Sequence, residues 1–285
     1  MDRINTWCRR TILSLVLLWP LQASAGSPEV ERLAKEAARH ADHTTVLIVG
    51  VTHDNERLAD ELLELLTLLR AKVEVDCLFV EYATDLQDEF DRAVEERDVV
   101  RVVEAFYLSS KPLFLTAFGS FGYNSDAQQT HIARVLESNV REIPKHAPIN
   151  RELLTYLRES KISLLPYDSH SRSKEMFDSV VFEIRRSWRS LEDNIPEPNA
   201  DMRAAVVKSL DARNSIMADN IISKFASRQC NKAVVVDCAD YVAPKGNIEW
   251  HYGIELDTYT PLQDRLREKG LPGERVGWLR GQGKP

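Results

Sequence analysis

The chain has 285 residues and a formal net charge of −7. An acidic chain without a basic stripe is a poor nucleic-acid binder, so we expect no nucleic-acid partner. The length suits one α/β domain with a sizeable core.

The first 25 residues have the composition of a secretory signal peptide. Arg3, Arg9 and Arg10 precede an apolar run over 12–18, and Ala23, Ser24 and Ala25 form a small-residue cleavage site. An uncleaved N-terminal anchor is the alternative. We therefore expect an exported protein, periplasmic or extracellular, that begins near Gly26. Residues 26–285 would form a single domain with no membrane span after cleavage. The apolar run over 12–18 is itself too short to cross a bilayer as a mature helix.

Three cysteines follow this segment: Cys77, Cys230 and Cys238. An odd number does not make a disulfide framework. One bridge, between Cys230 and Cys238, and three buried thiols are both open alternatives.

Short apolar runs over 46–49, 77–80, 162–165 and 233–236 predict four strands. The runs are continuous rather than alternating, which is typical of strands buried on both faces of a parallel sheet. Helical patterns alternate with them, at 26–43, 58–69, 85–109, 148–160, 174–191, 201–228 and 261–269, and an edge strand is predicted near 275–279. Leu153, Leu154 and Leu157 should face inward, and Asp54 or Asn55 should cap the helix over 58–69. This order predicts an α/β fold with a mainly parallel central sheet covered by helices.

Residues 111–126 interleave Phe114, Phe118, Phe121 and Tyr123 with Pro112, Gly119 and Gly122. We predict an aromatic loop here. It is open to two interpretations, a lid over a site or local hydrophobic packing.

Each of the four apolar runs ends in ionisable residues: His53 and Asp54, Glu81, Asp168 and His170, and Asp237 and Asp240. The carboxyl ends of parallel strands lie along one edge of a sheet, where open α/β sheets bind ligands. A carboxylate beside a buried run must also be paired, hydrogen-bonded or metal-bound. We therefore expect a functional site at this edge.

Arg213 lies on the apolar face of the predicted long helix, three residues after Leu210 and four before Met217. An arginine on a core-facing stripe requires an anion, and Glu81 or a ligand carboxylate or phosphate would serve. The alternative is a side chain that extends to solvent at the edge of the stripe.

Two chemistries suit these residues. His53, Glu81 and Asp240 can ligate a divalent ion such as Mn, Zn or Co, which would produce a hydroxide nucleophile from bound water. Without a metal, His53 and Glu81 can act as a general base and its orienting partner. A capping or core histidine is the structural alternative for His53.

The segments 50–55 (GVTHDN) and 79–81 (FVE), and Arg213-Asn214 with Met217-Ala218, resemble the Tiki/TraB superfamily, which includes the haem-uptake protein ChaN and the erythromycin esterases. The resemblance implies an α/β fold with a pocket built from two G-x-x-H motifs, a glutamate and an arginine. His53, Glu81 and Arg213 would be the first histidine, the glutamate and the arginine. The second motif departs from the pattern, because Asp240 stands at the histidine position and Asp237 at the glycine position; His251 is a potential substitute.

Two functions follow from this resemblance and from the strand-end residues. The first is an exported hydrolase of an ester or amide bond in a small-molecule or peptide substrate, with His53, Glu81 and Arg213 as catalytic residues. The second is a non-catalytic haem- or ligand-binding protein of the ChaN type. Its iron ligands would come from Tyr82, Tyr167, His170 or His251.

Overall fold

The structure is a computed structural model, and it describes residues 27–51, 55–120, 122–146, 148–178, 200–238 and 260–279. The predicted signal peptide lies outside these residues. Among them, no helix is both long enough and apolar enough to cross a membrane.

A central sheet of five parallel strands organises the fold, in the order β3-β2-β4-β1-β5. The strands are β1 (Val46–Val51), β2 (Cys77–Ala83), β3 (Ser163–Asp168), β4 (Ala233–Cys238) and β5 (Gly273–Leu279). The described residues of β1, and nearly all those of β2 to β4, are buried, as their apolar runs predicted. The α/β fold with a parallel central sheet is therefore confirmed.

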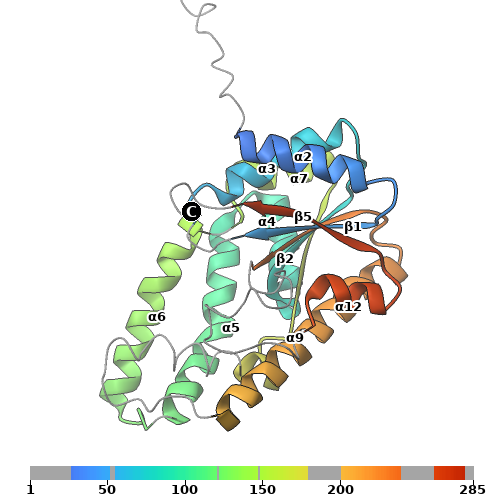
Figure 1. Ribbon diagram of the computed structural model, residues 1–285. Coiled ribbons are helices and arrows are strands. Elements are labelled where there is room, and N and C mark those ends of the chain that lie inside the picture. Colours follow the sequence, from blue (N-terminus) through green and yellow to red (C-terminus); the bar gives the residue numbers. More distant parts are fainter. Residues whose placement is uncertain are drawn as a thin grey trace, which may run out of the picture.

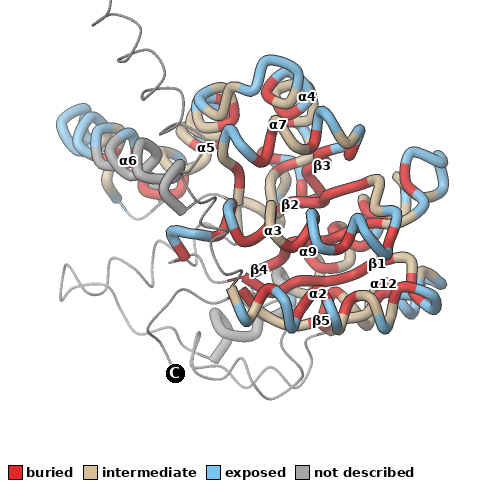
Figure 2. Tube along the Cα trace, turned by 90° about the horizontal axis from the view of Figure 1, so that it is seen from above, coloured by how far each residue is buried: buried red, intermediate tan, exposed pale blue. Residues whose placement is uncertain are grey.

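Helices cover both faces of the sheet, as Figure 1 shows. One face packs against α2 (Pro28–His40), α3 (Leu58–Arg70), α4 (Gln87–Glu96) and α7 (Arg151–Ser160). The other packs against α9 (Ala200–Ala226) and α12 (Leu262–Glu268), and we call its buried cluster the α9-side core. Figure 2 shows buried strands between helices that are exposed on their outer sides.

Most of the predicted helices are confirmed within a few residues. Leu153, Leu154 and Leu157 are buried on α7, and residues 174–178 are helical, while 179–191 lie outside the described residues. The predicted N-cap of α3 at Asp54 or Asn55 is wrong, because the helix begins at Leu58 and its N-cap position is Arg57. Asn55 instead accepts a hydrogen bond from the backbone N–H of Arg57 at 3.0 Å, and so holds the turn that precedes the helix.

The aromatic loop predicted over 111–126 is wrong. The helical segment after β2 divides at Arg97, which has a left-handed backbone (φ 59°), and a second helix, α5 (Val99–Ser120), runs through Pro112. It forms a hairpin with α6 (Asp126–His146), which the sequence did not predict. Ala117 and Phe118 lie on one face of α5 and pack with Ile132 of α6, so the alternative of local packing is confirmed.

The disulfide joins Cys77 to Cys230 and not Cys230 to Cys238. It links the first residue of β2 to the turn that follows α9, and both half-cystines are buried. Neither alternative that the sequence left open is therefore correct, because the fold brings the start of β2 beside the end of α9.

Candidate functional site at the carboxyl edge of the sheet

Strand register places two carboxylates at one level of the sheet. Asp237 of β4 pairs with Gly50 of β1, and Val80 of β2 pairs with Val236, so Glu81 lies level with Asp237. Phe79 and Val235, two residues earlier, belong to the α9-side core. Because side chains alternate along a strand, Glu81 and Asp237 face the same side.

Arg213 of α9 binds two carboxylates at this edge. Its Nε donates to Asp168 Oδ1 at 2.8 Å and its Nη2 donates to the second oxygen of the same carboxylate. Nη2 also donates to Glu81 Oε1 at 3.2 Å. The predicted burial of Arg213 and its pairing with Glu81 are confirmed, but Asp168 is the bidentate partner.

The packing of α9 explains this position. Met217, Ala218 and Ile221 are fully buried in the α9-side core, and Arg213 lies one turn before Met217. Asn220 then donates to the backbone carbonyls of Tyr167 and Asp168, at 3.0 and 3.2 Å. The helix that carries Arg213 thus also holds the last two residues of β3.

Asp237 and Tyr167 form a buried pair beside the arginine. Both are 0 % exposed, and the Tyr167 hydroxyl lies 2.8 Å from Asp237 Oδ1 and 3.1 Å from the Val236 carbonyl. Burial and the charge of Glu81 raise the pKa of Asp237 well above its usual range. Among the described residues, nothing hydrogen-bonds to Asp237 Oδ2, so this buried oxygen is available to a group from elsewhere.

The hydroxyl of Tyr167 carries one hydrogen but faces two oxygens. The Tyr167 hydroxyl therefore shares its one hydrogen between Asp237 Oδ1 and the Val236 carbonyl, both of which accept from it.

Gly50 is required at its position by a close contact. A Cβ added there would collide with the ring of Trp278 on β5. The glycine of the G-x-x-H motif therefore lets an aromatic ring lie over β1, one strand away from Asp237.

The structure tests only part of the predicted site. Glu81 and Arg213 come together, whereas His53, Asp54, Asp240 and His251 lie outside the described residues. The metal set of His53, Glu81 and Asp240 therefore stays a prediction. Sequence reasoning placed Asp168 and Asp237 at this edge but gave neither a role; the signal was an aspartate directly after a buried strand.

Of the two tyrosines proposed as haem ligands, Tyr167 is fully buried, and Tyr82 is partly buried and packed against aromatic rings. The ring of Tyr82 contacts those of Phe90 and Phe106, with centroids 5.2 and 5.9 Å apart. Burial raises the pKa of both Tyr82 and Tyr167, which disfavours the phenolate that ligates iron. His170 is half exposed and accepts a hydrogen bond from the backbone N–H of Arg172 at 3.1 Å.

Within the described chain, one group of side chains has the spacing of a metal site: Asp76, Cys77 and Cys230. Its two sulfurs are joined in the disulfide, so the thiolate ligands are consumed. This group lies at the other end of β2 from Glu81.

Fold and site together define an α/β protein with an arginine-bridged carboxylate cluster at the carboxyl edge of a parallel sheet. No protein-family model matches the chain, and no curated protein matches it. A solved structure described as the type III effector HopBA1 is similar at 12% sequence identity, over 75% of this chain and 76% of that chain, with a TM-score of 0.43. These comparisons do not test the Tiki/TraB resemblance, which stays a prediction.

Proposed function

We propose that this protein hydrolyses an ester or amide bond at the carboxyl edge of the sheet, with Glu81 as the residue that activates water. The observation that carries the proposal is the order Asp168–Arg213–Glu81. A buried aspartate fixes an arginine, and the arginine holds a more accessible glutamate.

The two carboxylates bound by Arg213 differ in exposure, which suits the roles proposed for them. The side chain of Asp168 is 3% exposed and that of Glu81 is 16% exposed, so water reaches Glu81 more readily. An opposite charge within hydrogen-bond distance favours the ionised carboxylate, the form that accepts a proton from water. Because Arg213 is already bound by Asp168 and Glu81, we assign it the positioning of Glu81 rather than the binding of a substrate anion.

A divalent ion fits the oxygen donors of this edge. Asp237 Oδ2 is a buried oxygen without a hydrogen-bond partner among the described residues, but Asp237 would have to lose its proton to ligate Mn²⁺, because the ionised carboxylate is the form that binds a metal. Glu81, with His53 and Asp240 as predicted from the sequence, would hold the ion. When bound, it would lower the pKa of a coordinated water.

The test uses the purified protein with p-nitrophenyl esters and p-nitroanilides, with added Mn²⁺ or with EDTA. Glu81→Gln keeps an oxygen that can accept from Arg213 but removes the base, so we expect kcat/KM to fall by about 10²- to 10⁴-fold. His53→Ala should also lower it. Asp211→Asn is the matched control, since Asp211 lies on α9, as Arg213 does, but pairs with Arg265 of α12 outside the cluster. Equal rates for the parent and Glu81→Gln would refute the proposal.

We further propose that the protein is exported. The Cys77–Cys230 disulfide is compatible with an oxidising compartment. N-terminal sequencing of protein recovered from the periplasm or medium should find a start near Gly26, whereas a start at Met1 would favour an anchor.

A further inference from the structure

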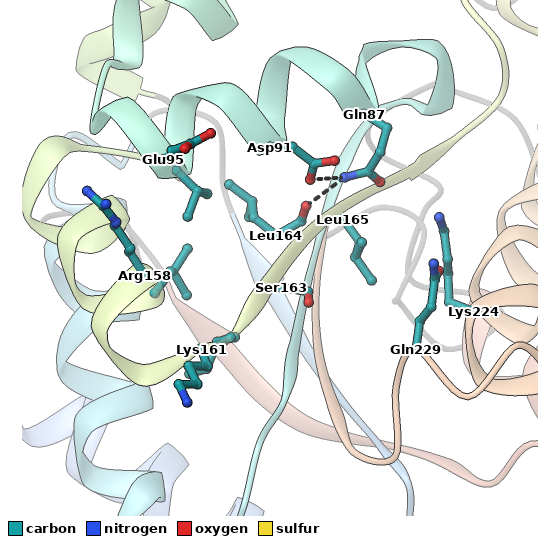
Figure 3. A pocket seen from close by; sticks show the side chains of 13 residues that line it. Gln87, Asp91, Glu95, Arg158, Lys161, Ser163, Leu164, Leu165, Lys224 and Gln229 are labelled. Atoms are coloured by element: carbon teal, nitrogen blue, oxygen red, sulfur yellow. Dashed lines mark hydrogen bonds between the residues drawn. The ribbon is translucent and has the colours of Figure 1, made fainter.

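A groove follows the outer edge of β3, at the opposite end of that strand from Asp168. β3 is the terminal strand of the sheet, and residues 161–165 line a cavity of about 640 Å³ with α4 and the end of α9. Figure 3 shows Asp91 and Glu95 along α4, Arg158 and Lys161 beside the start of β3, and Lys224 and Gln229 across from them. The volume lies within the range of about 300–1,000 Å³ of known ligand sites.

The backbone of β3 is only partly used at this edge. Ser163 donates to the Asp76 carbonyl on the β2 side, so the peptide groups of Leu164 point outward. The Leu164 carbonyl accepts from the side-chain amide of Gln87 at 3.2 Å. Among the described residues, nothing bonds to the Leu164 N–H, and the Pro166 carbonyl faces the same way. These groups can bind an added strand once Gln87 moves aside.

The helices on the two sides of the groove differ in charge, and two further cations, Arg158 and Lys161, lie at the end of the groove beside the start of β3. α4 lies on the face to which Leu164 points, and it contributes Asp91 and Glu95. α9 lies on the face to which Leu165 points, and it contributes Lys224. Within the described part of the chain, none of these three groups has an ion-pair partner.

We propose that this groove binds an extended peptide of alternating charge as a sixth strand beside β3. Alternate side chains of such a peptide face opposite sides of the sheet, so basic residues would face α4 and acidic residues would face α9. The spacing of the acidic groups on α4 matches the spacing of alternate residues in a strand. Asp91 and Glu95 are four residues apart on a helix, a rise of about 6 Å. Residues two apart on a strand are about 6.6 Å apart.

The same charges oppose a second copy of this chain as the occupant. Two β3 strands paired about a twofold axis would bring α4 against α4 and α9 against α9. Asp91 and Glu95 would then meet their own copies, and so would Lys224, with like charges in contact.

The probe is a labelled (Lys-Glu)₄ peptide with blocked ends, measured by fluorescence anisotropy on the full protein. A Lys₄Glu₄ peptide has the same composition and charge but lacks the alternation. We expect only the alternating peptide to bind, and Asp91→Asn/Glu95→Gln to weaken its binding about five- to tenfold, the effect of two exposed charge pairs. Lys224→Gln should weaken it less. Asp88→Asn/Glu89→Gln removes the same charge from α4 outside the groove and should leave binding unchanged.

Backbone pairing is tested by two peptides, one N-methylated at each Lys and one at each Glu. In an added strand, only one of these sets of N–H groups faces β3, so only one peptide should lose binding. Equal binding of both N-methylated peptides and the parent peptide would overturn strand addition. Equal binding of the block peptide, or unchanged binding by Asp91→Asn/Glu95→Gln, would overturn the proposed pattern of charges. A concentration-dependent dimer that Lys224→Gln strengthens would assign the edge to a second copy instead.

Discussion

Asp168 and Glu81 share the guanidinium of Arg213 unequally. Asp168 is the more buried of the two and takes two hydrogen bonds, whereas Glu81 takes one at 3.2 Å. Breaking a buried pair leaves a charge without compensation, at a cost of about 3–5 kcal/mol. We therefore expect Arg213→Met to lower the free energy of unfolding by that amount in urea titrations. Asp168→Asn should cost more than Glu81→Gln; the reverse order would mean that Glu81 is the principal partner.

Asp237 should make stability depend on pH. Its pKa is raised in the folded protein by burial and by the charge of Glu81, with a smaller rise from Asp168; Tyr167 and Arg213 act in the opposite direction. The folded state therefore binds this proton more tightly than the unfolded chain does. The contribution of this group is complete below the ordinary pKa of about 4 and is lost as pH rises through the folded pKa.

Asp237→Asn removes that titration and keeps an amide oxygen that accepts from the Tyr167 hydroxyl. We expect the variant to unfold at a higher urea concentration than the parent at pH 8, with the difference shrinking toward pH 4. Comparing the two proteins at each pH isolates the contribution of Asp237, because the variant differs from the parent at this residue alone. A difference that stays constant from pH 5 to pH 8 would show that Asp237 does not hold its proton.

At the scale of elements, the disulfide ties β2 to the end of α9 across 153 positions of the chain. Removing a native disulfide from a small secreted domain typically costs about 2–5 kcal/mol. We expect Cys77→Ser/Cys230→Ser to lower the free energy of unfolding by about that amount. Cys238→Ser is the control, and peptide mapping without reductant should recover Cys77 linked to Cys230. Recovery of a Cys230–Cys238 peptide would contradict the structure.

The strands β1 to β4 were predictable from the sequence because each contains a short apolar run, which indicates burial on both faces, whereas β5 has no such run and was predicted only as an edge strand. The α5–α6 hairpin was not, because Pro112, Gly119 and Gly122 are typical of loops. Helical packing of Phe118 on Ile132 overrides that local preference. Arg213 was predictable as a buried cation needing an anion. Its preference for Asp168 was not, because strand register and the angle of α9 decide which carboxylate it reaches.

At the scale of the whole molecule, the α5–α6 hairpin stands apart from the sheet (Figure 1). Val102 and Ala105, near the start of α5, belong to the core on the α4 side of the sheet, whereas Ala117, Phe118 and Ile132 form a separate small cluster in the outer half of the hairpin. Segments with few buried apolar contacts open locally at a lower free energy than core strands do. The outer half of the hairpin should therefore open without unfolding the sheet.

Native-state hydrogen exchange tests this with two matched truncations. Phe118 belongs to the hairpin cluster and Phe90 to the core between α4 and the sheet; both are buried, and Phe→Ala in a core costs about 3–5 kcal/mol. We expect Phe118→Ala to speed exchange of amides in the end of α5 and the start of α6, and to leave those of β1, β2 and β4 unchanged. Phe90→Ala should speed exchange in the strands as well. If Phe118→Ala speeds strand exchange as much as Phe90→Ala does, the hairpin unfolds together with the sheet, and the two are one cooperative unit.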